Sequence, residues 1–209
     1  MHTITALKPQ KRSKSRVNVF LDGKFAFGMA FQIAHNLNVG QKLSGNDIVR
    51  LQVEDEVEKA HDKVLAFLAH RPRSETEVST RLARHGFPME VAQTVLQRLR
   101  AADLVDDTAF AAFWVENRSA FRPRGHRALR AELLQKGVSD KVIESVLEDV
   151  NQQVDARRAA DKRVVRLRDL PERERRRKLR EFLARRGFEY DIISDVIDKL
   201  MAEEYDNED

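Results

Sequence analysis

The chain has 209 residues, with 38 Lys and Arg against 34 Asp and Glu, a formal net charge of +4 and no cysteine. The lack of cysteine excludes disulfides, thiol catalysis and cysteine-ligated zinc, and it is consistent with the reducing cytosol. Only 8 Gly and 5 Pro argue against an all-β protein with many tight turns. No apolar run could cross a bilayer and residues 1–20 lack a signal-peptide core, so we expect a cytoplasmic protein with no membrane partner.

Residues 1–52 differ from the rest of the chain, and we expect there a mobile basic tail, a β-hairpin and short helices. Residues 16–29 alternate in hydropathy around Asp22-Gly23, a pair that tolerates the positive φ angles of a two-residue hairpin turn. Residues 30–51 predict short helical pieces, broken at Gly40 and Gly45. A lone hairpin is marginal in water, so this module should pack on its neighbour. The basic residues of the tail are Lys8, Lys11, Arg12, Lys14 and Arg16.

From about residue 54 the pattern is helical, and a glycine-centred stretch occurs three times. It reads LARHGF at residues 82–87, LLQKGV at 133–138 and LARRGF at 183–188. The same apolar spacing follows each glycine, as in an amphipathic helix. Gly86, Gly137 and Gly187 are suited to the left-handed conformation that ends a helix. Self-similarity at a period of about 50 residues indicates tandem repeats.

We therefore expect a mainly α protein, in which tandem three-helix repeats form an elongated curved rod beside the small N-terminal hairpin-and-helix module. A compact cluster of nine helices is the alternative arrangement. The expected repeats are residues 53–105, 106–152 and 153–203, followed by an acidic tail at 204–209 that should fray.

An Arg-Pro-Arg turn belongs to the repeat in two of its three copies. It occurs at residues 71–73 and 122–124, whereas the third unit has Leu170-Pro171 at that place. After the first turn, Ser74 and Glu77 have the spacing of a capping box. The arginines are either simply solvated or present guanidinium groups at equivalent places on successive units; the pattern leaves both open.

No catalytic motif is present: there is no His-Glu-x-x-His, no phosphate-binding glycine loop and no nucleophile elbow. Asp106 and Asp107 fit a helix start, where carboxylates bind free amides. We expect no enzyme, no metal and no cofactor.

Basic charge is the remaining chemical signal. Twelve Lys and Arg residues between 157 and 180 form either a solvated, ion-paired helix face or a face for phosphate or an acidic partner. Trp114 could stack on bases, but its helical phase with Phe110 favours burial in the core. The glycines are expected to be structural caps.

Several stretches resemble the RecX family of bacterial regulatory proteins. They are RPRS-x-x-E at residues 71–77, DD-x-x-FA at 106–111, WVENR at 114–118, RG-x-x-AL-x-x-EL-x-x-KGV at 124–138 and FLARRGF at 182–188. The similarity covers about residues 59–200, and Leu37-x-x-Gly40-x-x-Leu43 resembles the N-terminal extension of longer members.

This resemblance implies a monomer that binds in the groove of the RecA–DNA filament and inhibits ATP hydrolysis, strand exchange and coprotease activity, which tempers the SOS response. Two other hypotheses are a DNA-binding protein with helix-turn-helix-like units, on single- or double-stranded DNA, and a structural adaptor. The residues that we expect to contact the partner or DNA are Arg71, Arg73, Arg122, Arg124, Arg127, Lys136, Arg185 and Arg186.

Overall fold

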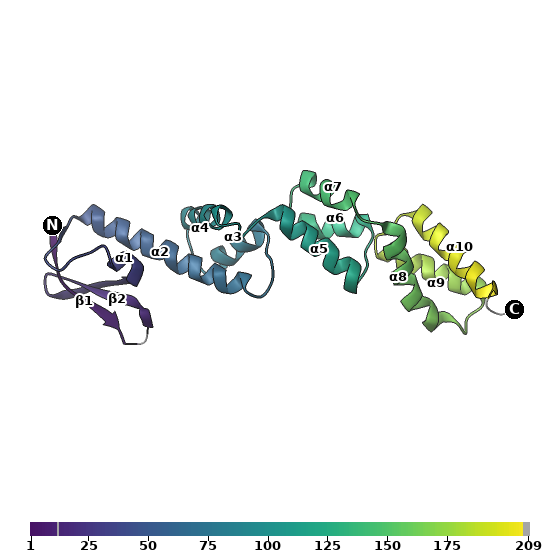
Figure 1. Ribbon diagram of the computed structural model, residues 1–209, viewed down its shortest axis with the longest axis horizontal. Coiled ribbons are helices and arrows are strands. Elements are labelled where there is room, and N and C mark those ends of the chain that lie inside the picture. The colour runs from purple at the N-terminus through teal and green to yellow at the C-terminus, as the bar shows by residue number, and fades with distance from the viewer. Residues whose placement is uncertain (12, 207–209) are drawn as a thin grey trace. The chain divides into compact units, whose positions relative to one another are not determined.

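The computed structural model of the protein describes residues 1–11 and 13–206, and it is mostly helical with one small sheet (Figure 1). This confirms the mainly α prediction with three-helix groups and an N-terminal strand module. Arg12 of the expected basic tail, and residues 207–209 of the acidic one, lie outside the described residues. The chain divides into two compact units: residues 1–71 with 78–104, and residues 72–77 with the chain from 105 onward.

The first unit begins with a four-stranded sheet in the order β3-β2-β1-β4. Strands β2 (Ser13–Leu21) and β3 (Lys24–Ala30) form the expected hairpin. Asp22 and Gly23 turn it with φ angles of 49° and 82°, both in the left-handed region, so this prediction is confirmed. The buried face of the sheet includes Ile4, Val17 and Val19.

The expectation of a mobile basic tail is wrong. Residues 2–10 form strand β1 (His2–Gln10), which pairs with β2 and, through its first residues, with β4 (Lys42–Leu43). Ile4 is fully buried and lies opposite Leu21, while Lys8 lies over the Phe20 ring at 5.0 Å. A strand can carry lysines at its exposed positions, and the charge of this segment hid its pairing.

The short helical pieces after the sheet are also fewer than expected. Helix α1 (Phe31–Ala34) is short, but α2 (Gly45–Leu68) runs without a break from Gly45. Ser44 and Asp47 form a reciprocal capping box at its start, with Ser44 Oγ accepting from the Asp47 amide at 3.1 Å. A glycine in the first turn after a strong cap begins this helix rather than interrupting it.

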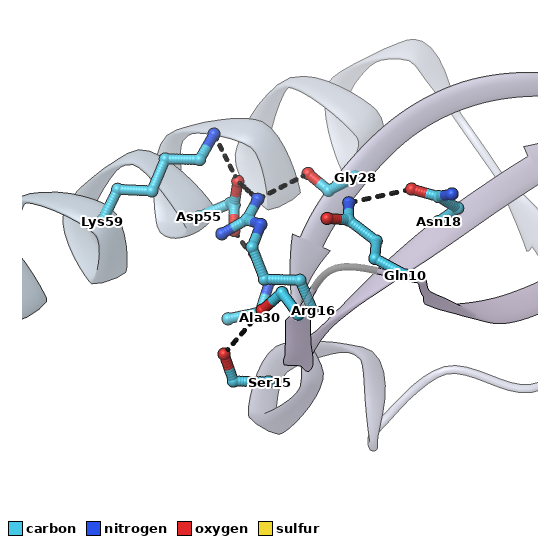
Figure 2. Close-up of polar contacts among 9 residues, drawn as sticks. Gln10, Ser15, Arg16, Asn18, Gly28, Ala30, Asp55 and Lys59 are labelled. Carbon is cyan, nitrogen blue, oxygen red and sulfur yellow. Dashed lines mark hydrogen bonds and ion pairs between the residues drawn. The ribbon is translucent and has the colours of Figure 1, made fainter.

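A buried carboxylate fixes α2 to the sheet (Figure 2). Asp55 is 2% exposed and accepts hydrogen bonds from Arg16 Nη2 at 2.8 Å and from the Ala30 amide at 2.8 Å. Its third partner is Lys59 Nζ at 2.7 Å. Burial alone would raise the pKa of Asp55, but these three donors outweigh it and hold the pKa below its ordinary value.

We predict that Asp55→Asn destabilises the sheet against α2 by about 2–4 kcal/mol, because an amide cannot satisfy three donors or balance Arg16. The folded-state pKa is lowered, so the carboxylate stabilises the unit above about pH 3.9, and this is lost as pH falls through the folded pKa. Amide hydrogen exchange over residues 16–34 measures both effects. Asp62→Asn, on the exposed side of the same helix, is the control; equal protection in the two variants would contradict the assignment.

The rest of the chain consists of helices that group in threes. The first unit is completed by α4 (Met89–Ala101), which packs along α2, and by most of α3 (Glu75–Arg84). In the second unit, α5 (Asp107–Phe121), α6 (His126–Gln135) and α7 (Asp140–Glu148) surround one core. Helices α8 (Gln152–Val164), α9 (Glu172–Arg185) and α10 (Tyr190–Asp206) surround another, with the 3₁₀ turn η1 (Val165–Leu167) after α8. Residues 204–206, which we expected in the acidic tail, continue α10.

The middle helix of each group of three, which is α3, α6 or α9, ends in the same way. Gly86, Gly137 and Gly187 have φ angles of 80°, 79° and 83°, and the amide after each glycine bonds to the carbonyl five residues earlier, at 3.1–3.3 Å. This is the Schellman arrangement, which satisfies carbonyls that the helix leaves free.

In the second unit the repeats meet at these helix ends. Ser74 Oγ donates to the Lys136 carbonyl at 2.7 Å, and the Gly125 amide donates to the Arg186 carbonyl at 3.0 Å. In both contacts the donor is the residue just before the middle helix of one repeat. The acceptor is the residue just before the capping glycine of the following repeat. We call these two contacts the first and second joints.

Each joint has a second hydrogen bond of the same kind. The Glu75 amide donates to Asp107 Oδ1 at 2.9 Å, and the His126 amide donates to Gln152 Oε1 at 3.2 Å. The first amide of one middle helix is thus capped by the first residue of the next repeat's leading helix. Asp106 caps its own helix at the Thr108 amide, as expected, but Asp107 caps a neighbouring one.

We predict that Gly125→Ala destabilises the second unit by about 1–3 kcal/mol, because a β-carbon there would overlap the backbone of Gly187 and Phe188. Gly45→Ala is the matched control, since nothing lies within 4 Å of its β-carbon. Denaturant unfolding followed by Trp114 fluorescence measures the difference, because Trp114 is the only tryptophan and lies in this unit. Equal unfolding midpoints would contradict a close backbone contact at the second joint.

Candidate functional site

The two joints of the second unit gather most of the basic residues singled out in the sequence. Arg73 and Lys136 lie at the first joint, next to Ser74 and Gly137. The second joint contains Arg122, Arg124, Arg127 and Arg186. Arg185 is exposed at the end of α9, whereas Arg71 belongs to the first unit.

At the first joint the basic side chain is paired with a carboxylate. Lys136 Nζ lies 2.7 Å from Glu77 Oε1, and both side chains are largely buried. The same ammonium lies 4.9 Å from the centre of the Trp114 ring. Glu77 also donates its amide to Ser74 Oγ at 3.1 Å, which confirms Ser74 as a helix cap. The charge at this joint is therefore internally balanced.

Trp114 is half-buried and packs on the core of its repeat, with its ring centre 5.9 Å from that of Phe110. Its Nε1 donates to Glu132 Oε2 at 2.8 Å. The Arg118 guanidinium lies 4.5 Å over the ring and donates to the same oxygen at 2.7 Å. Cations and a core residue surround this indole, so the contacts favour a structural role over an open platform for bases.

At the second joint three arginines meet with little negative charge. The Arg186 guanidinium lies 4.6 Å over the Phe182 ring and donates from Nη1 to the Pro123 carbonyl at 2.9 Å. Burial, together with the charges of Arg124 and Arg122, holds the pKa of Arg186 below its ordinary value. We call Arg122, Arg124 and Arg186 the arginine cluster.

The nearest carboxylate recorded for the cluster is only loosely engaged. Glu132 Oε1 lies 3.7 Å from Arg124 Nε, which is longer than a hydrogen bond, and its other oxygen already accepts from Trp114 and Arg118. Arg124 Nε is buried and lacks a hydrogen-bond acceptor among the described residues. The cluster therefore carries excess positive charge and unused donors.

Arg127 belongs to the second joint but has different surroundings. Its Nη2 donates to the Ala184 carbonyl at 3.2 Å. It lines a hollow that also contains Glu144, Glu148 and Glu189. This arginine faces a charge-balanced surface and is not part of the cluster.

Among the described residues, four members of the long basic run between residues 157 and 180 have recorded ion pairs, namely Arg157, Arg176, Arg177 and Lys178. Arg157 binds Asp161 and Glu203, and the hydrogen bonds that its guanidinium donates to these carboxylates raise the pKa of Arg157 above its ordinary value. Arg176 binds Glu172 and Asp198, with the same effect on its pKa. Arg177 pairs with Glu174 and Glu181 on the surface of α9. These contacts favour the solvated, ion-paired interpretation of that run over a phosphate-binding face.

Sequence reasoning missed the role of Glu132, and it placed Glu77 in a capping box without its contact with Lys136. Glu132 connects Trp114, Arg118 and Arg124. One signal was available: Trp114 and Arg118 are four residues apart, as are Glu132 and Lys136, so each pair lies on one helix face.

The described residues include no group of three or more His, Asp or Glu that could hold a metal ion. In the same part of the chain, no helix combines the length and the apolar character that a bilayer crossing requires.

We predict that Glu132→Ala shifts the emission of Trp114 and destabilises the second unit by about 1–3 kcal/mol, because the indole N–H and the Arg118 guanidinium lose their acceptor. Glu116→Ala, an exposed glutamate on α5, is the matched control. Fluorescence spectra and denaturant unfolding of both variants measure the two effects. An unchanged spectrum in Glu132→Ala would contradict the contact.

Comparison with known protein families identifies four matching regions in order along the chain. Residues 2–44 match the regulatory protein RecX N-terminal domain, and residues 60–99, 106–147 and 152–197 match the first, second and third three-helix domains of RecX. Together they cover most of the chain, including the sheet module.

Individual relatives are similar over the same extent. Regulatory protein RecX of Bacillus licheniformis is 32% identical over all of this chain and 80% of its own length. RecX of Geobacillus kaustophilus is 37% identical over 77% of this chain and 61% of its own. A crystal structure of a regulatory protein RecX aligns with a TM-score of 0.77 and 30% identity, covering 95% of this chain and all of that one. The crystal structure of RecX from Lactobacillus salivarius shares the fold, with a TM-score of 0.64 and 24% identity. The alignment covers 71% of this chain and 99% of that chain.

Proposed function

Because the chain belongs to the RecX family of regulatory proteins, we propose that it binds the RecA–DNA filament and inhibits its ATPase, strand-exchange and coprotease activities. The ordered match of all four domains carries this proposal. Inhibition of these activities would temper recombination and the SOS response. In this proposal the protein acts in the cytoplasm as a monomer, by binding rather than by catalysis, and needs no cofactor.

The charges of the second unit support such a partner. A recombinase filament on DNA presents phosphate groups along its length, and an excess of arginine attracts such a polyanion. The arginine cluster supplies this excess, whereas Lys136 at the first joint and Arg176 and Arg177 on α9 have carboxylate partners. We therefore assign the contact with the filament to the surface around the second joint.

Helix-turn-helix readout of duplex DNA is less well supported. In that motif the last helix enters the major groove and meets phosphates on both sides. Here the last helices of the second and third repeats carry acidic residues, namely Asp140, Glu144 and Glu148 on α7 and Asp191, Asp195 and Asp198 on α10. Such helices would be repelled by the groove.

We predict that the protein lowers the single-stranded-DNA-dependent ATPase and the strand exchange of its cognate RecA in proportion to its concentration. Arg122→Gln/Arg124→Gln should weaken this inhibition, because it removes two charges of the cluster. Arg130→Gln/Arg177→Gln removes the same charge from ion-paired surface sites and should keep it. Steady-state ATP hydrolysis and joint-molecule formation measure both. Unchanged rates with a stoichiometric excess of the unsubstituted protein would refute the proposed function.

A further inference from the structure

We propose that the arginine cluster at the second joint is a binding site for the phosphate backbone of a nucleic acid strand, and that the bound strand stabilises the contact between the second and third repeats. This inference rests on the proposed function for its setting, a filament that contains DNA. The experiments below use the protein without recombinase. The phosphate-binding site can therefore fail its test while inhibition of RecA stands, and the reverse.

The cluster is assembled from both repeats. Arg122 and Arg124 flank Pro123 in the turn before α6, and Arg186 is the last residue before the capping Gly187 after α9. Two hydrogen bonds fix the two segments together: Arg186 Nη1 to the Pro123 carbonyl and the Gly125 amide to the Arg186 carbonyl. The joint thus holds the Arg186 guanidinium against the turn that carries Arg122 and Arg124, and this placement requires that the two repeats be docked.

Most donors of the cluster have no recorded acceptor within residues 1–11 and 13–206. Each guanidinium has five N–H donors in a planar fork. Among the described residues, the recorded side-chain contacts of the cluster are one hydrogen bond from Arg186, its position over Phe182, and the long Arg124–Glu132 pair. No side-chain partner is recorded for Arg122 in that part of the chain, and its side chain is exposed. The site therefore offers positive charge and hydrogen-bond donors to an anion that carries acceptors.

A phosphate backbone suits this arrangement better than an acidic protein segment. Paired phosphate oxygens match the fork of a guanidinium, and several arginines side by side can engage a row of phosphates. Two nearby carboxylates already have partners: Glu132 accepts from Trp114 and Arg118, and Glu144 pairs with Arg130.

Binding should strengthen the joint. Three like charges held together repel one another, and the lowered pKa of Arg186 reflects this repulsion together with burial. A bound phosphate group between the two segments removes the repulsion and adds hydrogen bonds to both. Ligand binding and repeat docking are therefore coupled through the same three side chains.

The first experiment measures binding of a fluorescently labelled oligothymidylate strand by anisotropy at several salt concentrations. Arg122→Gln/Arg124→Gln should bind roughly 10-fold more weakly than the unsubstituted protein, with a slope of log K against log salt smaller by about 1.4. The matched control Arg130→Gln/Arg177→Gln loses the same net charge from exposed pairs in the same unit and should keep both values. Equal weakening in the two double variants would overturn the site, because binding would then follow net charge alone.

The second experiment separates the two kinds of polyanion. A polyglutamate peptide of the same charge replaces the strand, and only weak binding that is insensitive to Arg122→Gln/Arg124→Gln is expected. Equal or tighter binding of polyglutamate, lost in the same variant, would overturn the assignment to nucleic acid in favour of an acidic protein.

The third experiment tests the coupling to the joint. Saturating strand should slow amide hydrogen exchange at residues 125–129 and 186–188 in the unsubstituted protein, and it should not do so in Arg122→Gln/Arg124→Gln. Without ligand, Arg122→Gln should unfold at an equal or higher denaturant concentration than the unsubstituted protein, because the repulsion is relieved. A clearly lower midpoint would show that Arg122 stabilises the fold, which contradicts a residue held for a ligand. Binding with no change of exchange at the joint would refute the proposed stabilisation.

Discussion

The second unit depends on the close approach of one repeat to the helix end of the next. At both joints, the backbone or side chain before a middle helix bonds to the carbonyl that precedes a capping glycine. This contact leaves no room for a β-carbon: one at Gly137 would overlap Thr76, and one at Gly187 would overlap Ala128. These two glycines therefore meet two separate requirements, a left-handed φ and a surface without a side chain. Gly86 meets only the first, since nothing lies within 4 Å of its β-carbon position.

This constraint explains where the Arg-Pro-Arg turn occurs. Its last arginine immediately precedes the docking residue, Ser74 in the first repeat and Gly125 in the second. The third repeat has Leu170-Pro171 at this place, and no contact of this kind is recorded for that turn among the described residues. The Arg-Pro-Arg turn is thus found at both places where such a joint is recorded among the described residues. The capping glycine is kept in all three because every middle helix must end.

The sequence was sufficient for the hairpin, the helical repeats and the capping glycines, because turn chemistry and periodicity are local properties. It was insufficient for β1, a strand that is recognised by its pairing partners. It was also insufficient for Asp55, because two of its three donors, Arg16 and Ala30, lie in the sheet and far from it in the sequence. The sequence was enough to single out arginines and lysines as candidate binding residues. Only their contacts in the structure distinguish Arg124 and Arg186, at the cluster, from Arg127 and Arg176. The deciding property is which carboxylate lies beside each arginine, and no spacing rule gives that across repeats.

Among the described residues, arginines with carboxylate partners and arginines without close ones lie in different parts of the second unit. We infer that the position of the positive charge matters, and not only its amount. Where α9 is exposed, Arg176 and Arg177 are neutralised within hydrogen-bond distance by carboxylates of α9 and α10. At the second joint, where burial and the charges of Arg124 and Arg122 act on Arg186, the recorded carboxylate is Glu132, which lies 3.7 Å from Arg124 Nε and accepts hydrogen bonds from Trp114 and Arg118. Stability alone would favour the opposite arrangement, with acidic residues at the crowded joint and solvent around the exposed ones. At the first joint Glu77 neutralises Lys136, so the free-energy cost of unpaired charge is avoided. At the second joint this cost remains, as a site for an external anion requires.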